Sequence, residues 1–435
     1  MRIAIWHNLP SGGGKRALYY QVRGLIDRGH TVESWCPPTA DQSYLPLREL
    51  AKEHVVSVSP SPNRGRAFYL TRDYGACLDT IKAMDRHCRE CAEQIDRAGF
   101  DLLLAAPCKF LAAPAIARHS RLPAVIYLQE PCRRLYEASP SLPWVALDRP
   151  SGWWRSPTYF RQRVVDFLSL RANRVQAREE LRNARAFVSI LVNSYYSRES
   201  ILRAYGLDAT VCYLGVDTKL FVNQGRPREN LVVGLGMFVR HKNIDFAIRA
   251  LGYVRQPRPR LVWVGNMSSP SYLEELKRLA AATGVCFDPK VNIQDSELVA
   301  ILNRAQVMVY APRLEPFGFA ALEGNACGLP VVAVAEGGVR ETINDGINGL
   351  VVEHNPQAMA AAVEHLLDHP EYARRLGQNG CAAVSGRWTL SHSIERLEDR
   401  LLQVLDKVNL GEQERICCQD SRVLSSPAAD VLDKA

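Results

Sequence analysis

Two glutamates, Glu315 and Glu323, stand eight residues apart on either side of a Pro-Phe-Gly turn. Pro316 favours the start of a helix, so the amide groups of Gly318 and Phe319 should be unpaired at its N-terminus, where a phosphate binds readily. Glu323 would lie about one turn inside that helix. The spacing predicts a site for a ligand with a phosphate and hydroxyl groups. Taken alone, such a pair is more often a helix-dipole carboxylate followed by a solvated one.

A glycine-rich loop near the N-terminus offers a second place where backbone could approach a phosphate. Gly12, Gly13 and Gly14 are followed by Lys15, and the run continues in the G-x-G-x-x-A pattern of dinucleotide-binding loops. Glu33 stands about 20 residues further on, where a ribose-binding acid is expected. This pattern favours an alternative hypothesis, a nicotinamide- or flavin-dependent enzyme that uses Gly12–Gly14. A plain turn between strand and helix would explain the glycines as well.

The elements that must position these residues alternate between short apolar runs and amphipathic stretches, which is typical of parallel sheets covered by helices. We therefore predict an α/β fold with two doubly wound, Rossmann-like domains that face a central cleft. The first domain would span residues 1–222 and the second 223–388. A helix over 389–408 would pack back on the first domain, and 409–435 would be a disordered tail.

The 435 residues are 47% hydrophobic and 23% charged, the composition of a globular protein. No apolar run reaches the ~18 residues of a membrane span. The start, Met1–Asn8, is typical of a buried strand and too short for a signal peptide. The twelve cysteines show no framework spacing, and Cys88 and Cys91 have no second C-x-x-C pair to complete a zinc site. We expect reduced thiols, no bound metal and a cytoplasmic protein.

The positive charge is concentrated in the first half of the chain. Residues 1–220 hold 31 Lys and Arg against 21 Asp and Glu, a net charge of +10, and the remainder carries −2. Such a surface favours an anionic partner such as a lipid surface, although an ordinary solvated basic surface fits equally. Trp153 and Trp154, followed by the arginine-rich stretch 161–185, could touch a membrane interface or form a helical insertion. We expect that this half of the chain can contact a membrane surface peripherally, and that the protein does not bind nucleic acid.

Four motifs in the second half resemble family 4 of the GT-B glycosyltransferases. That family carries E-P-F-G-x-x-x-x-E, A-x-G-x-P-V-V-A, G-G-x-x-E and D-G-x-N-G, and the same patterns stand here at 315–323, 326–333, 337–341 and 345–349. The segments around Asn193, Tyr213–Asp217 and Gly236–Asp245 also resemble the family. The resemblance runs from residue 1 to about 405 and is strongest over 186–352.

The resemblance implies a retaining glycosyltransferase that takes a hexose-type sugar from a UDP-, GDP- or similar nucleotide sugar and passes it to a glycan or lipid-linked acceptor. Glu323 would accept hydrogen bonds from the ribose, and Glu315 would contact the transferred sugar. The amides of Gly318 and Phe319, with Lys242, would neutralise the departing diphosphate. Enzymes of this kind need no metal or cofactor, so Lys and Arg side chains and helix dipoles would stabilise the leaving-group charge. The donor phosphate would accept the proton of the acceptor, so no protein nucleophile would be required.

Two positions depart from the family pattern. Gln129 stands where relatives carry a histidine, and glutamine cannot accept a proton at neutral pH. Glu130 is a candidate substitute in the catalytic set, or a plain loop carboxylate. Met237 replaces an arginine that would pair with the diphosphate, and Arg240 or His241 on the same loop could compensate. These departures leave open a third hypothesis, a non-catalytic scaffold related to glycosyltransferases.

Overall fold

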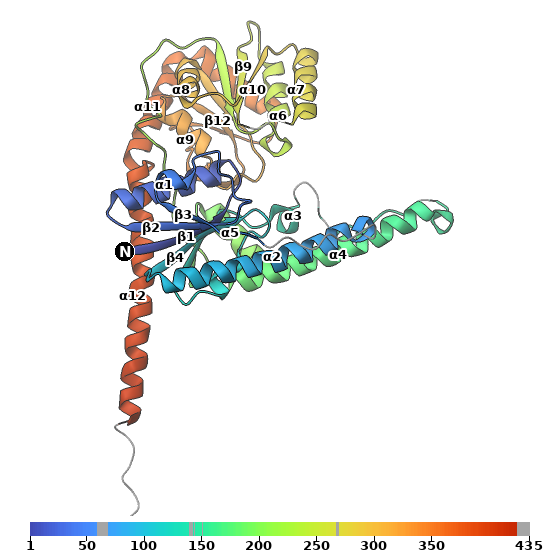
Figure 1. Cartoon of the computed structure of the whole chain (residues 1–435). Coiled ribbons are helices and arrows are strands. Elements are labelled where there is room, and N and C mark those ends of the chain that lie inside the picture. Colours follow the sequence, from blue (N-terminus) through green and yellow to red (C-terminus); the bar gives the residue numbers. More distant parts are fainter. Residues whose placement is uncertain (59–67, 139–141, 143, 150, 267–268, 424–435) are drawn as a thin grey trace, which may run out of the picture.

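The computed structural model describes residues 1–58, 68–138, 142, 144–149, 151–266 and 269–423. Two parallel β-sheets, each covered by helices on both faces, lie one above the other along the long C-terminal helix (Figure 1). The predicted α/β fold with two Rossmann-like units is confirmed.

The first sheet has seven strands in the order β3-β2-β1-β4-β5-β6-β7, and every pair is parallel. Its strands are β1 (Arg2–Asn8), β2 (Thr31–Cys36), β3 (Lys52–Val55), β4 (Leu102–Cys108), β5 (Ala124–Tyr127), β6 (Ser189–Val192) and β7 (Thr210–Val211). The helices around it are α1 (Gly13–Asp27), α2 (Phe68–Arg97), α3 (Arg133–Tyr136), α4 (Pro157–Ala184) and α5 (Tyr195–Tyr205), with short 3₁₀ turns η1 (Leu47–Glu49), η2 (Ala115–Arg118) and η3 (Trp153–Arg155). The central strands are continuous apolar runs because both faces of a parallel sheet are covered.

The second sheet has six parallel strands in the order β10-β9-β8-β11-β12-β13. Its strands are β8 (Leu231–Leu235), β9 (Arg260–Gly265), β10 (Phe287–Val291), β11 (Val307–Tyr310), β12 (Val331–Val334) and β13 (Gly349–Val352). The helices are α6 (Ile244–Tyr253), α7 (Pro270–Thr283), α8 (Asp295–Arg304), α9 (Phe319–Ala326), α10 (Pro356–Asp368) and α11 (Pro370–Arg387), with η4 (Arg240–Lys242) and η5 (Gly337–Glu341).

The strand orders place a topological switch point in each sheet, between β1 and β4 in the first and between β8 and β11 in the second. In open parallel sheets, ligands bind at the carboxyl ends of the strands beside such a point. The glycine loop follows β1, Gly236 follows β8, and the loop with Glu315 follows β11. All three loops are therefore brought to the positions that a ligand would use.

The last helix, α12 (Leu390–Val423), returns to the first sheet and packs against α1. Glu398 of α12 accepts hydrogen bonds from Arg28 and His30, both at 2.6 Å. The helix continues beyond residue 408, where we expected a disordered tail to begin. Leu410 and the Glu-Gln-Glu-Arg run are good helix formers, and no proline interrupts them before Pro427. The rest of the expected tail, 424–435, lies outside the described residues.

Among the described helices, none combines the length and the apolar character that a bilayer crossing requires.

Candidate active site

A pocket of about 230 Å³ opens between the two sheets at the ends of β8 and β11. Six of the residues singled out from the sequence line it: Gly12, Gly13, Lys242, Glu315, Phe319 and Glu323. Arg16 and Tyr44 from the first unit and Met237, Asn266, Asn292 and Asp295 from the second complete much of its wall. The structure thus brings residues from both halves of the chain to one cavity.

Lys242 and Glu315 form an ion pair inside this pocket. The Lys242 ammonium donates to Oε2 of Glu315 at 2.7 Å, and both side chains are largely buried. Burial raises the pKa of Glu315, but the Lys242 ammonium and the Arg133 guanidinium outweigh it and hold the pKa below its ordinary value. Glu315 therefore stays ionised at neutral pH and accepts hydrogen bonds, while the ammonium keeps two donors for a further ligand.

The loop that carries Glu315 is held by close backbone contacts. Gly338 donates its N–H to the Glu315 carbonyl at 2.8 Å, and the Ser194 hydroxyl of the first unit donates to the Pro316 carbonyl at 2.5 Å. A Cβ on Gly338 would lie 2.1 Å from the Pro316 oxygen, so only glycine fits there. The turn at Gly337 and Gly338 therefore fixes the position of this loop.

The helix that follows this loop begins with an uncapped N-terminus. Gly318, at the N-cap of α9, has a φ of 101°, which favours glycine, and no described side chain caps the helix. Phe319 and Ala320 line the pocket, so the first amides of α9 face the cavity. Glu323 is 3% exposed and lies one turn further along. The predicted arrangement, an uncapped helix start between two carboxylates, is present.

Glu323 is paired across the two units with Arg16, which the sequence did not lead us to expect. Nη1 of Arg16 donates to Oε1 of Glu323 at 2.5 Å, and its Nε donates to the Tyr44 hydroxyl at 2.9 Å. Burial raises the pKa of Glu323, and Arg16 opposes the rise only in part. The only sequence signal for Arg16 was its place two residues after the glycines.

Gln129 and Glu130 lie in the cleft but outside the lining of this pocket. A side chain on Gly14 would sit 3.6 Å from the Gln129 amide, which places Gln129 beside the glycine loop. Glu130 is 41% exposed and accepts from Arg133 at 2.5 Å. Burial raises the pKa of Glu130, Arg133 opposes the rise, and the Glu315 charge adds to it. Arg133 thus holds Glu130 on the first-unit side of the cleft.

Arg240 is not brought to the pocket. Its guanidinium donates to Glu275 of α7 at 2.8 Å and stacks over the Tyr272 ring, on the exposed side of the η4 turn. The turn places Lys242 inward and Arg240 outward, so Arg240 does not compensate for Met237. His241 is nearer the site, where burial and the adjacent Lys242 lower its pKa to about 4, so it is neutral at pH 7. The pocket contains Arg16 from the first unit instead, a cation that the sequence motifs did not assign to it.

Glu33 does not reach the glycine loop. It lies in the middle of β2 and accepts from His54 of β3 at 2.7 Å. A ribose-binding acid of a dinucleotide fold stands at the carboxyl end of that strand, which here is Cys36. The geometry therefore disfavours the dinucleotide hypothesis, and Gly12 and Gly13 instead share a cavity with the second unit.

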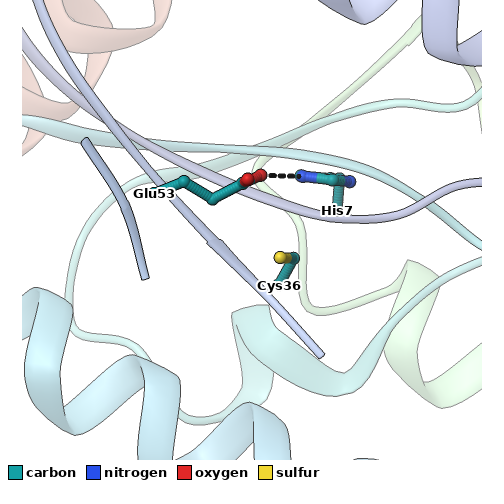
Figure 2. Close-up of side chains that lie close together, drawn as sticks. All are labelled: His7, Cys36 and Glu53. Atoms are coloured by element: carbon teal, nitrogen blue, oxygen red, sulfur yellow. Dashed lines mark hydrogen bonds and ion pairs between the residues drawn. The ribbon is translucent and has the colours of Figure 1, made fainter. Parts of the chain in front are cut away.

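A buried cluster of potential metal ligands is formed by side chains of β1, β2 and β3 (Figure 2). Nε2 of His7 and Glu53 are 3.0 Å apart, and Cys36 lies close to both. Burial lowers the pKa of the neighbouring Lys15, despite the attraction of Glu53, and burial also raises the pKa of Cys36 to about 12. That the protein needs no metal stays a prediction. The Cys88 and Cys91 thiols are packed in the core.

The asparagine of the D-G-x-N-G motif, Asn348, has a structural rather than a catalytic role. Asn348 and Asn325 form a buried amide pair at 2.9 Å, and Asn348 also bonds the Thr342 carbonyl and the Asn344 amide. We predict that Asn348→Ala lowers the unfolding free energy by about 2 kcal/mol or more, because it leaves buried groups without partners. Urea unfolding measures this. Asn379→Ala, which loses one exposed bond to Ile347, should change stability far less; equal losses would contradict the assignment.

The comparisons with known proteins agree with this geometry. Residues 216–383 match the family model described as glycosyl transferases group 1. The alpha-1,3/1,6-mannosyltransferase ALG2 of Rhizomucor pusillus is 26% identical over 209 residues, which are 40% of this chain and 46% of that protein. A GDP-mannose-dependent alpha-(1-6)-phosphatidylinositol monomannoside mannosyltransferase of Mycolicibacterium smegmatis is 35% identical over 225 residues, 46% of this chain and 56% of that protein. The chain spans about half the length of these curated relatives.

Two solved structures cover almost the whole chain. Anabaena Alr3699/HepE, in complex with UDP and glucose, is similar with a TM-score of 0.67 over 93% of this chain and 100% of that chain, at 19% identity. Sucrose-phosphate synthase of Thermosynechococcus elongatus is similar with a TM-score of 0.68 over 94% and 100%, at 17% identity. These likenesses show the fold. The part of this chain that carries Lys242, Glu315 and Glu323 matches the model of the group 1 glycosyltransferases, and the chain as a whole has the GT-B fold.

Proposed function

We propose that this protein transfers a hexose-type sugar from a nucleotide diphosphate sugar to a glycan or lipid-linked acceptor, with retention of configuration and without a metal ion. One observation carries the proposal: Glu315 and Glu323 flank the uncapped start of α9 in one pocket, with Lys242 beside them. A diphosphate fits the amides and the ammonium, and hydroxyl groups at either end of the donor fit the two carboxylates.

The charges of the pocket suit the departure of a nucleotide diphosphate. Breaking the bond between the sugar and the phosphate leaves a further negative charge on the diphosphate, which Lys242 and the α9 dipole stabilise. We propose that a phosphate oxygen of the donor accepts the proton of the attacking hydroxyl, so no protein base is required. Gln129 and Glu130, on the first-unit side of the cleft, would orient the acceptor by hydrogen bonds.

A thermal-shift panel of UDP-, GDP-, ADP- and dTDP-sugars tests the donor class. A ligand at 100 times its dissociation constant should stabilise the protein by about 2.7 kcal/mol. UDP-glucose and GDP-mannose are the first candidates, since HepE was solved with UDP and glucose and the Mycolicibacterium relative is named GDP-mannose-dependent. Stabilisation by NAD(P) or a flavin, unaffected by Glu323→Ala, would instead favour the dinucleotide hypothesis.

Arg16 is expected to set donor affinity through Glu323. We predict that Arg16→Ala raises the donor KM about tenfold or more, because the loss of a charged hydrogen bond costs about 1.5–3 kcal/mol. Without Arg16, the pKa of Glu323, already raised by burial, should rise further, and the protonated form accepts ribose hydrogen bonds less well. The KM ratio of variant to wild type should therefore be larger at pH 6 than at pH 8.

Steady-state kinetics at the two pH values measure this effect. Arg23→Ala is the matched control, since Arg23 lies on the same helix and pairs only loosely with Asp27 on the surface, at 3.9 Å. A donor KM that is equally unchanged in both variants would show that Arg16 has no part in donor binding.

Met237 lines the pocket at the position where the family pattern has a diphosphate-binding arginine. The alternative of a non-catalytic scaffold related to glycosyltransferases therefore needs its own test. Full-length protein that binds a nucleotide sugar but neither transfers nor hydrolyses it, across a broad acceptor panel, would favour that hypothesis. Nucleotide release in the presence of an acceptor would contradict it.

A further inference from the structure

Helices α2 and α4 form an arm that projects from the first unit, away from the long α12 helix (Figure 1). The two helices pack along each other, and the outer end of the arm is formed by η3 and the first turns of α4. Trp153 of η3 packs against Trp154, Tyr159 and Phe160, with ring centroids about 6 Å apart. An aromatic cluster therefore stands at the far end of the arm.

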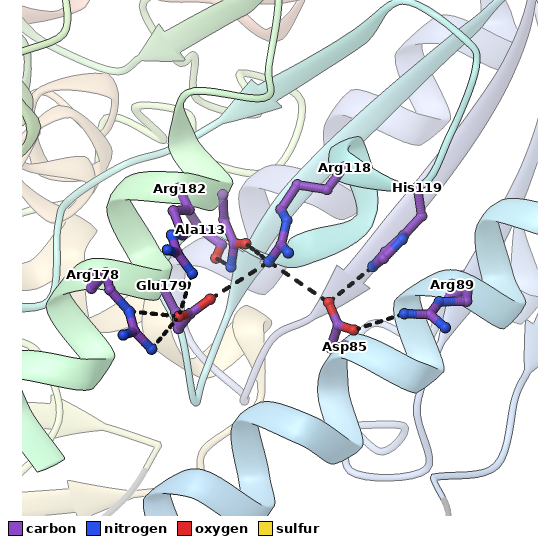
Figure 3. Close-up of polar contacts among 9 residues, drawn as sticks. Asp85, Arg89, Ala113, Arg118, His119, Arg178, Glu179 and Arg182 are labelled. Carbon is purple, nitrogen blue, oxygen red and sulfur yellow. Dashed lines mark hydrogen bonds and ion pairs between the residues drawn. The ribbon is translucent and has the colours of Figure 1, made fainter.

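The root of the arm is fixed by an ion-pair network (Figure 3). Asp85 of α2 accepts from His119 at 2.9 Å and lies 3.7 Å from Arg118. Arg118 also lies 3.6 Å from Glu179 of α4, which accepts from Arg182 at 3.2 Å. The network ties α2, η2 and α4 together at the sheet, so the outer end of the arm is held at a set position.

The outer arm is unusually apolar on its surface. Seven of the 17 large hydrophobic side chains that are exposed in the described chain lie between residues 142 and 167, and four of these belong to η3 and α4: Trp154, Phe160, Val164 and Phe167. Trp154 and Phe167 are each 62% exposed. Scattered exposed apolar residues are ordinary, but a cluster of them marks an interaction site.

The apolar residues of α4 continue into a basic stripe on the same face. Phe160, Val164 and Phe167 have i, i+4, i+7 spacing, and Arg171 and Arg174 follow at the next two turns. Arg174, like Arg161 near the tip, has no hydrogen bond or ion pair within the part of the chain that the structure describes. The apolar tip is therefore followed by free positive charge nearer the sheet.

The whole segment 142–178 contains seven arginines and two aspartates, a net charge of +5. A second copy of the chain would bring the same positive charge to the contact and be repelled, whereas an anionic surface would be attracted. Aromatic side chains beside arginines are typical of elements that lie in a lipid headgroup region. Charge complementarity thus selects an anionic bilayer as the occupant.

We propose that the arm surface, defined as Trp154, Phe160, Val164 and Phe167 with Arg161 and Arg174, docks this protein peripherally on an anionic phospholipid bilayer. The apolar side chains enter the headgroup region, and the arginines meet the lipid phosphates. This docking does not involve the donor pocket, so it can be tested independently of the proposed transfer reaction.

The arm is also connected to the acceptor side of the cleft. Arg134 of α3, a few residues after Glu130, donates to Asn173 and Gln176 of α4 at 2.5 and 3.0 Å. The arm and the proposed acceptor side of the cleft are therefore in direct contact, so a lipid-linked acceptor held at the arm could be passed towards Glu130. This last step rests on the proposed function, whereas the docking itself does not.

Co-sedimentation of the full chain with lipid vesicles tests the docking. We expect the wild type to bind vesicles of equal parts phosphatidylcholine and phosphatidylglycerol about tenfold or more tightly than pure phosphatidylcholine, and less tightly as salt rises. Phe160→Ser/Phe167→Ser and, separately, Arg161→Ala/Arg174→Ala should each weaken binding about tenfold or more. Both pairs are exposed, so the fold should be retained.

Matched controls are two exposed apolar residues elsewhere, Leu202→Ser/Tyr253→Ser, and two exposed arginines of the second unit, Arg249→Ala/Arg278→Ala. These variants should bind vesicles as the wild type does. Equal binding to both kinds of vesicle, no binding, or unchanged binding by the arm variants would overturn the proposal. Concentration-dependent self-association that Phe160→Ser/Phe167→Ser abolishes would assign the surface to a second copy instead. Nucleotide-sugar thermal shifts should be unchanged in all arm variants.

Discussion

Lys242→Ala is expected to lower kcat about 100- to 1,000-fold, the cost of removing one group that stabilises developing charge. The ammonium is the cation nearest to Glu315, at 2.7 Å, and it lines the pocket beside the start of α9. Without it, the leaving diphosphate keeps the helix dipole and Arg16 but loses its closest positive partner. Nucleotide release measured in steady state gives the value, and circular dichroism checks that the fold is retained.

Lys277→Ala is the matched control for this variant, because Lys277 pairs with Glu274 on the surface of α7, away from the pocket. It should leave kcat unchanged. Glu315→Gln combined with Lys242→Ala separates charge loss from an unpaired carboxylate. If the unpaired Glu315 were the whole cause, the double variant would be as active as Glu315→Gln alone, and the proposed role of Lys242 in stabilising the diphosphate would be refuted.

Glu315→Ala is expected to reduce kcat at least about 100-fold while the donor KM changes little, the pattern of a group that acts mainly in the transition state. Glu315 is held by Gly338 and Lys242 and stays ionised, because the surrounding cations lower its pKa. It is therefore placed to accept hydroxyl hydrogen bonds from the transferred sugar. Glu315→Gln, which keeps an acceptor oxygen, should lose less activity than the alanine variant.

Glu275→Ala tests whether any loss is specific, since Glu275 forms an exposed pair with Arg240 outside the pocket. Its kcat should match the wild type. A Glu315→Ala protein with normal kcat and a raised donor KM would move the role of Glu315 from the transition state to ground-state binding.

The fold and the second-unit half of the site could be predicted because their signals are local. Alternating apolar runs indicate parallel strands, and the Glu-Pro-Phe-Gly run places two carboxylates around one helix start within nine residues. The sequence also placed Lys242 correctly in the same pocket, although by resemblance rather than by spacing. The roles of these residues stay predictions until they are measured.

The contacts between the two units could not be predicted from spacing. Arg16 and Glu323 are 307 positions apart, and no local pattern links them. Arg240 and Lys242 stand two residues apart, yet the 3₁₀ turn sends one outward and one inward. Glu33 has the right sequence distance for a ribose ligand but lies mid-strand, because the helix and turn before β2 are longer than that fingerprint assumes. Register and turn geometry decide these cases.

The most direct test is a crystal structure of the protein with a non-transferable nucleotide-sugar analogue. We predict a diphosphate against the first amides of α9, within hydrogen-bonding distance of Lys242, with the ribose at Glu323 and the sugar at Glu315. A nucleotide bound at another place, with this pocket left without a ligand, would contradict the proposed role of the pocket.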